Sequence, residues 1–229
     1  VIEDASHAAG AFYNTSEPVG NCKYSVATIF SFNAIKHIAM GEGGCVTTNK
    51  KDIAQDIVMK RSHGMIRDKT KFDSIPEKNA PWYYEMQNLG WNYRADEMSC
   101  ALGLSQLNRL DKNIKKRNML VDHYYSALHN LENIKLPKKS KKIFNNAWHL
   151  FPIKINFKNI KKSRGTVMNE LALHGIGTQV HYIPLYLQPY YKQKNIKQFS
   201  GANEYYNDCL SIPLNTLLKK EDIFYIAKI

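Results

Sequence analysis

Short apolar runs rich in β-branched residues alternate with a helical pattern in the first third of the chain, and this alternation limits the folds open to it. The runs lie at residues 1–4, 23–32 and 45–48, and turn-forming residues bound each of them. Residues 52–62 carry apolar side chains at helical spacing, with Asp52 as the expected N-cap. Strands that alternate with helices in this way predict an α/β sheet.

A second pattern begins after this region. Residues 95–131 carry apolar side chains at helical spacing without a proline, which predicts one long helix, or two in series, joining two lobes. The remaining elements are expected as strands at 148–155, 177–182 and 211–213, and as helices at 163–174, closed by Gly175, and near 204–209. We therefore predict a larger α/β domain at residues 1–117 and a smaller α+β domain at residues 118–229.

Composition excludes several classes of protein. The 229 residues are 44% hydrophobic and 23% charged, which is typical of a globular chain. The net charge of +12 would suit a nucleic-acid surface, but no recognition helix or stacking motif accompanies the lysines, so we expect a solvated basic surface and no nucleic-acid partner. No apolar run is long enough to span a membrane, so no membrane partner is expected.

The cysteines and histidines point away from metal chemistry. The four cysteines form no CxxC pair, and the eight histidines form no HExxH or other cluster with metal-ligand spacing. We therefore expect no metal site. Widely spaced cysteines without a pairing pattern are typical of reduced thiols, which indicates a cytoplasmic protein.

Three polar residues lie at or just after the ends of the expected strands: Asp4, Ser31 and Lys36. Open α/β sheets place their ligands at the carboxyl ends of strands. A carboxylate, a hydroxyl and an amine at this separation could hold pyridoxal phosphate (PLP), with the acid on the ring nitrogen, the hydroxyl on the phosphate and the lysine as Schiff base. Considered singly, each has a plainer role, as a turn cap, as a donor to a backbone carbonyl and as a surface lysine.

Further motifs follow in order along the chain. They are GEGG at residues 41–44, LGWNYRADE at 89–97 with ALGLSQL at 101–107, and GIGTQVHY at 175–182. Together with Asp4, Ser31 and Lys36, these motifs resemble the DegT/DnrJ/EryC1/StrS family of sugar-nucleotide aminotransferases. The resemblance runs from the first residue nearly to the last.

The resemblance implies a partial fold-type-I PLP transferase. Such a protein has a three-layer αβα large domain, which binds PLP, and a smaller carboxyl-terminal domain. Family members carry an upstream stretch with a Gly-Thr phosphate cup and an aromatic that stacks on the cofactor ring, and neither is present here. The chain also begins without Met inside an expected strand, so we expect it to be truncated at its amino terminus.

The resemblance also assigns roles to individual residues. Lys36 becomes the catalytic Schiff-base residue, and Asn92 reaches the cofactor phosphate of a neighbouring subunit, which implies a homodimer with shared active sites. The other cofactor-binding residues are Asp4, His7 and Ser31, and the substrate-binding residues are His181, Tyr182 and Arg94. Without the resemblance, Asn92 is a loop residue beside an Arg94 that pairs with Asp96 or Glu97, and the 175–182 segment suits core packing equally well.

The implied reaction is transamination from an amino acid, with L-glutamate as the expected donor, to C4 of a nucleotide-linked 4-keto-6-deoxy sugar. Residues 82–87, 180–184 and 187–191 resemble a branch of the family that takes a UDP-linked sugar. The aromatic residues at 82–84 and 190–191 offer flat faces for a sugar or a uracil, and the basic surface favours a diphosphate-linked substrate over a free sugar. Three alternatives remain at this point: a branch of the family that takes dTDP- or GDP-linked sugars, a PLP-dependent dehydratase, and an inactive truncated or regulatory relative. In the dehydratases, as the resemblance has it, a His stands where Lys36 is here.

Overall fold

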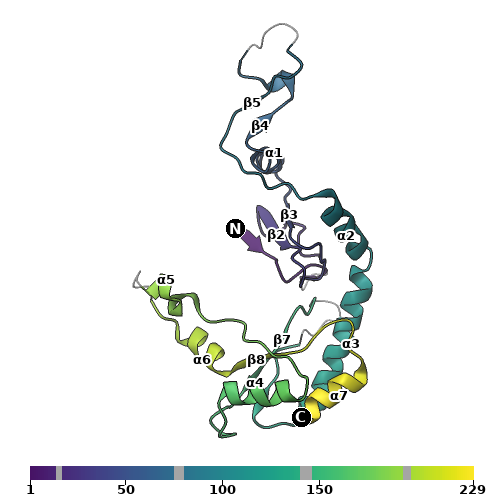
Figure 1. Ribbon diagram of the computed structural model, residues 1–229, viewed down its shortest axis with the longest axis vertical. Coiled ribbons are helices and arrows are strands. Elements are labelled where there is room, and N and C mark those ends of the chain that lie inside the picture. Colours follow the sequence, from purple (N-terminus) through teal and green to yellow (C-terminus); the bar gives the residue numbers. More distant parts are fainter. Residues whose placement is uncertain (14–16, 75–79, 140–145, 193–196) are drawn as a thin grey trace. The chain divides into compact units, whose positions relative to one another are not determined.

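The computed structural model describes residues 1–13, 17–74, 80–139, 146–192 and 197–229 (Figure 1). These residues form two compact units, Val1–Leu110 and Asp111–Ile229, which are described separately below. No helix within the described ranges has both the length and the apolar character that crossing a membrane requires.

A three-stranded sheet organises the amino-terminal unit. Its strands, in spatial order, are β1 (Ile2–Asp4), β2 (Ala27–Ser31) and β3 (Gly44–Thr47). β1 runs parallel to β2 with Asp4 opposite Ile29, and β3 runs antiparallel to β2 with Gly44 opposite Ser31. The three predicted strands are therefore confirmed; β1 and β2 are shorter than their apolar runs, and β3 begins one residue before its run.

The rest of this unit continues from β3. Its elements are α1 (Lys51–Lys60), the antiparallel pair β4 (Met65–Ile66) and β5 (Glu85–Met86), and the 3₁₀ turn η1 (Lys69–Lys71). The prediction that Asp52 is the N-cap of α1 is wrong, because Lys50 occupies that position and its side chain forms no capping bond. Asp52 lies instead in the first helical turn, where its negative charge still faces the positive end of the helix dipole.

The long helical region consists of two helices in series, α2 (Glu97–Leu107) and α3 (Leu110–Leu128). Asp96 caps α2, since its carboxylate accepts the Ser99 N–H at 2.9 Å. At the junction the Arg109 N–H donates to the Gln106 carbonyl, three residues back, and the ladder tightens before α3 begins. The predicted domain boundary at residues 117–118 falls inside α3, seven residues after the last residue of the first unit, Leu110.

The carboxyl-terminal unit is built on an antiparallel sheet in the order β6-β7-β8. Its strands are β6 (Ile134–Lys135), β7 (Phe151–Ile155) and β8 (Cys209–Ile212), and its helices are α4 (Arg164–Leu173), α5 (Pro189–Lys192), α6 (Ser200–Asp208) and α7 (Lys220–Lys228), with the 3₁₀ turn η2 (Leu185–Leu187). Ser163 caps α4 by accepting the Thr166 N–H, so the predicted start of that helix is confirmed.

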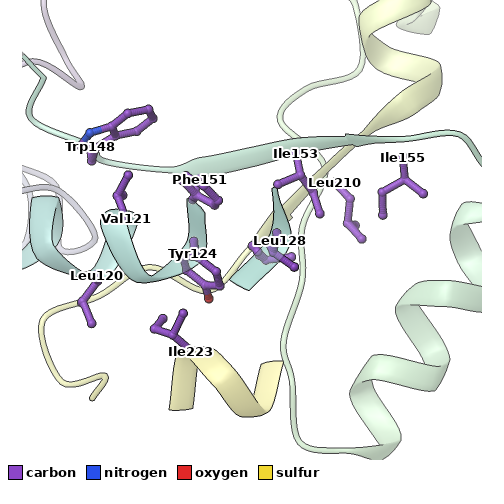
Figure 2. Close-up of a cluster of buried hydrophobic side chains, with 11 residues drawn as sticks. Leu120, Val121, Tyr124, Leu128, Trp148, Phe151, Ile153, Ile155, Leu210 and Ile223 are labelled. Carbon is purple, nitrogen blue, oxygen red and sulfur yellow. The ribbon is translucent and has the colours of Figure 1, made fainter. Parts of the chain in front are cut away.

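The core of this unit lies where α3 packs on β7 and β8 (Figure 2). The Tyr124 and Phe151 rings stack with centroids 4.8 Å apart, and both side chains are completely buried. Arg117 is buried beside them and donates to the carbonyls of Trp148, His149 and Leu214, which satisfies its charge with fixed dipoles.

Two predicted strand segments are corrected by the structure. Residues 177–182 form no strand, since only Gln179 makes an isolated bridge, to Ser211 of β8. Residues 148–150 do not extend β7, because Trp148 has a positive φ of 23°, which extended backbone does not allow. Both segments carry the apolar and aromatic residues typical of strands, but neither continues a strand ladder.

Candidate functional site

The candidate site lies at the edge of the amino-terminal sheet where β1 and β2 end. Asp4 is the last residue of β1 and Ser31 is the last residue of β2. Since these strands are parallel, their carboxyl ends meet at one edge. The antiparallel β3 begins at the same edge, with Gly44 opposite Ser31. The sequence therefore places the two polar side chains together through strand direction alone.

Asp4 is held as a carboxylate at this edge. Its Oδ1 atom accepts both the Ser6 hydroxyl at 2.6 Å and the Ser6 backbone N–H at 3.0 Å. These two hydrogen bonds lower the pKa of Asp4 below its ordinary value of 3.8, with smaller contributions from the charges of His7 and Lys36. The lowered pKa keeps Asp4 ionised at neutral pH.

Lys36 lies on a loop whose two ends are tied to the sheet edge. The Phe32 N–H donates to the Gly43 carbonyl at 2.8 Å, and the Met40 N–H donates to the Phe32 carbonyl at 2.9 Å. Within the loop the Lys36 N–H donates to the Asn33 carbonyl at 2.9 Å, which closes a turn. The backbone thus leaves the sheet after Ser31, presents Lys36 and returns to β3.

Close packing beneath the loop depends on one glycine. A Cβ atom on Gly44 would lie 2.5 Å from the carbonyl oxygen of Phe30, so any larger residue would push β3 away from β2. His37 and Ile38 are buried under the loop, whereas Ile35 at its tip is exposed. The buried pair anchors the loop and leaves Lys36 half-buried beside the edge.

The opposite face of the same sheet carries a group that the sequence patterns did not reveal. Glu3 accepts hydrogen bonds from three hydroxyls, those of Tyr13 at 2.7 Å, Ser25 at 2.9 Å and Thr28 at 2.8 Å. Thr28 is on β2 and is fully buried. Because Glu3 precedes Asp4 in β1, these bonds fix the position of β1 against β2 and so the position of Asp4. Strand alternation was the available signal, since consecutive residues must face opposite sides.

Asn92 and Arg94 lie on a segment bonded to the end of α1. The Trp91 N–H donates to the Lys60 carbonyl, and the Tyr93 N–H donates to the Arg61 carbonyl. Gly90 permits this approach, since a Cβ there would lie 2.1 Å from the Gly64 nitrogen.

Both predicted site residues of this segment are exposed. Within the described residues Arg94 forms no ion pair, and its expected partner Asp96 instead caps α2. The plainer reading of Arg94 as a paired structural residue is therefore wrong. Among the described residues, no hydrogen bond or ion pair joins this segment to Asp4, Ser31 or Lys36, so the structure does not link these two sets of site residues directly.

His181 and Tyr182 belong to the carboxyl-terminal unit. The His181 Nδ1 atom lies 2.7 Å from the Ser211 Oγ atom of β8. The Tyr182 ring meets the His181 ring edge-to-face at 4.6 Å and is exposed. The structure brings Asp4, His7, Ser31 and Lys36 to one edge of the first unit, and it places His181 and Tyr182 together in the second.

Comparison with known proteins gives a consistent result. The DegT/DnrJ/EryC1/StrS aminotransferase family matches residues 1–229. The spore coat polysaccharide biosynthesis protein SpsC of Bacillus subtilis is 34% identical over 227 residues, covering 97% of this chain and 57% of SpsC. A UDP-4-amino-4,6-dideoxy-N-acetyl-beta-L-altrosamine transaminase of Campylobacter jejuni is 34% identical, covering 99% of this chain and 56% of the transaminase.

A solved structure shows the same fold. Helicobacter pylori PseC, described as an aminotransferase involved in the biosynthesis of pseudoaminic acid, has a TM-score of 0.85 and 30% sequence identity, covering 99% of this chain and 57% of PseC. The chain therefore spans a little over half the length of the relatives that it matches.

Proposed function

Because this chain belongs to the DegT/DnrJ/EryC1/StrS aminotransferase family, we propose that the protein is a PLP-dependent aminotransferase acting on a nucleotide-linked keto sugar. The observation that carries the proposal is the meeting of Asp4, Ser31 and Lys36 at one strand edge. The partial fold-type-I architecture agrees with it, since the aminotransferase PseC shares this fold.

The groups at this edge fit the cofactor. Both hydrogen bonds to Asp4 end on Oδ1, and no described residue donates to its Oδ2. The Ser31 Oγ atom accepts only a long bond of 3.5 Å from the Asn33 N–H, and it donates to no described residue. Lys36 forms no ion pair within the described ranges. An anionic oxygen, a hydroxyl hydrogen and an amine thus remain for a ring nitrogen, a phosphate and a carbonyl carbon.

When bound, PLP supplies an electron sink for the carbanion that forms at the amino-acid carbon. Asp4 would hold the proton on the ring nitrogen, and its lowered pKa suits that task because it keeps the carboxylate charged. Ser31 would donate to the phosphate, and His7 would lie near the ring hydroxyl. Lys36 would bind the cofactor and then move the proton at the reacting carbon.

The proposed substrate is a UDP-linked 4-keto-6-deoxy sugar, aminated at C4 with L-glutamate as donor. The Campylobacter relative, which is named as a UDP-sugar transaminase, and the pseudoaminic acid enzyme PseC support a role in surface-glycan biosynthesis of that kind. The net charge of +12 favours a diphosphate-linked sugar over a free one. We assign His181, Tyr182 and Arg94 to the substrate side.

We further propose a homodimer with shared active sites, in which Asn92 serves the cofactor phosphate of the partner subunit. Asn92 is exposed, and exposed apolar side chains surround it in sequence, among them Leu89, Trp91 and Met98. Monomers seldom expose so many large apolar groups within one stretch, and a second subunit would cover them.

Two rivals are separable by experiment. A dehydratase of this family would carry a His in place of Lys36, so the amine favours transamination. An inactive relative would not bind PLP, and its solution would lack the visible absorbance of the protein-bound cofactor.

The test offers UDP-linked and dTDP-linked 4-keto sugars, with L-glutamate, to the full-length protein. We expect amination of the UDP-linked sugar to be fastest, measured by mass spectrometry of the product. A preference for a dTDP-linked sugar would move the protein to a sister branch, and loss of the sugar oxygen without amination would identify a dehydratase. Absence of the visible cofactor band would refute the whole assignment.

A further inference from the structure

Ser211 occupies a fixed position in the second unit. It is buried, with 6% of its surface exposed, and it lies in β8 opposite Pro152 of β7. Its backbone N–H donates to the Gln179 carbonyl at 2.8 Å, and its carbonyl accepts the Gln179 N–H at 3.1 Å. Both backbone groups of Ser211 therefore attach the 176–182 segment to the sheet, two residues before His181.

The side chain of Ser211 makes a second attachment, to the His181 ring. Its Oγ atom lies 2.7 Å from His181 Nδ1, and either atom could donate. If Nδ1 carried the proton, the buried Ser211 hydroxyl hydrogen would need another acceptor, and no other hydrogen bond of this hydroxyl occurs among the described residues. A buried hydroxyl without an acceptor is costly, so the favoured arrangement has Ser211 donating to an unprotonated Nδ1.

From this geometry we propose that Ser211 is a positioning residue that holds His181 in the tautomer with the proton on Nε2. In a neutral imidazole one nitrogen is the donor and the other the acceptor, so an Nδ1 that accepts from Ser211 makes Nε2 a donor. His181 therefore meets a substrate oxygen, on the phosphate or on the sugar, as a hydrogen-bond donor. The Tyr182 ring, packed edge-to-face on the imidazole, restricts its rotation further. The substrate half of this inference rests on the proposed function.

The first measurement tests the tautomer directly. The full-length holoenzyme is labelled with ¹⁵N-histidine, and long-range ¹H–¹⁵N correlation spectra are recorded where the imidazoles are neutral, with His181→Gln assigning the signal. We expect Nδ1 of His181 to have the shift of an unprotonated nitrogen. Ser211→Ala should move both nitrogens toward the averaged shifts of mixed tautomers, and Ser211→Thr, which keeps the hydroxyl, should restore the pattern. A protonated Nδ1 in the wild type would overturn the proposal.

The second measurement separates positioning from general damage. Ser211→Ala should raise the KM for the nucleotide sugar by about three- to tenfold, the loss expected for one hydrogen bond, with kcat and the KM for the amino donor unchanged. Ser126→Ala is the matched control, since Ser126 is an exposed serine of α3 that bonds only its own helix. An unchanged sugar KM in Ser211→Ala would overturn the substrate half. Failure of the wild type to aminate any keto sugar would refute the proposed function instead, while the spectra still test the Ser211–His181 pair.

Discussion

The two units of the chain differ in how completely they bury their own apolar side chains. The carboxyl-terminal unit has a cluster of eleven buried residues that joins α3, β7, β8 and α7, whereas the main cluster of the amino-terminal unit has four, including Phe30 and Ile38. Burial of apolar surface is the main stabilising contribution to folding. Burial within the unit therefore stabilises the second unit more than the first, which holds the proposed cofactor groups.

The helix α2 shows this difference clearly. Its sequence is apolar on every side, a pattern typical of a helix buried all round, yet Gly103 is its only buried residue. Met98 and Leu104 are among its exposed side chains. An exposed apolar helix of this kind is a surface that the proposed homodimer would cover.

The largest expected effect is that of Lys36→Ala, because it removes the proposed cofactor-binding amine and the proton carrier together. Transamination by the full-length protein should fall by about 10³-fold or more, with the unfolding transition unchanged. Lys112→Ala, an exposed lysine of α3, is the control and should retain full activity. Appreciable turnover by Lys36→Ala would show that Lys36 is not the catalytic amine.

Mixing variants sharpens the same prediction. Subunits carrying Lys36→Ala should be combined with subunits carrying Asn92→Ala, each inactive or impaired as a pure dimer. A mixed dimer would contain one site with both groups, so part of the activity should return after subunit exchange. If the mixture stays as inactive as the separate variants, Asn92 does not serve the partner subunit.

A matched pair of leucines tests the difference in burial. Leu210 is fully buried in β8, and Leu104 is 64% exposed in α2. Leu210→Ala should lower the free energy of unfolding by about 2–5 kcal/mol, whereas Leu104→Ala should change it by less than about 0.5 kcal/mol. Leu104→Ala should instead weaken self-association, measured by analytical ultracentrifugation. Equal losses of stability from the two substitutions would mean that α2 is already buried within one subunit.

The smallest expected effect is on the pH dependence of the free energy of unfolding, to which one tyrosine in each unit contributes. Burial, together with the hydrogen bond to Glu3, raises the pKa of Tyr13 from 10.0 to about 12. Burial also raises the pKa of Tyr124, which donates to the Pro213 carbonyl at 2.6 Å.

A folded pKa above the unfolded one gives stabilisation that is complete below pH 10 and is lost as the pH rises through the folded value. For Tyr13 that window runs from 10 to about 12. Denaturant titrations in this window should give a steeper loss of stability for the wild type than for Tyr13→Phe. Identical slopes would show that the pKa of Tyr13 is not raised in the folded protein.

The local patterns of the sequence were sufficient for much of the fold. Strand and helix periodicity predicts β1, β2, β3, α1 and the two helices in series, because each depends on which neighbouring side chains are apolar. The 177–182 segment was predicted wrongly because a strand needs a partner edge, and only Gln179 finds one. The predicted N-cap of α1 was also wrong, since a shift of two residues at a helix start leaves the apolar periodicity of the helix unchanged.

Only part of the candidate site could be predicted from the sequence. Asp4, Ser31 and Lys36 meet at the expected edge, and strand order explains that meeting. Their roles as cofactor ligands stay predictions, since they came from family resemblance. The hydrogen bonds that three hydroxyls donate to Glu3 and the Ser211–His181 contact could not be predicted. Both join residues that are far apart in the sequence, and both depend on the pairing register of strands.

The two adjacent carboxylates of β1 have a consequence for how this segment can diverge. Glu3 binds hydroxyls on one face of the sheet and Asp4 points to the other. Inserting or deleting one residue in β1 would move each side chain to the opposite face of the sheet. Glu3 would then leave its three hydroxyl donors, and Asp4 would leave the edge beside Ser31. Natural variation within β1 should therefore arise by substitution at constant length, whereas the loop from Asn33 to Ile38 has an exposed tip where a change of length disturbs no ladder.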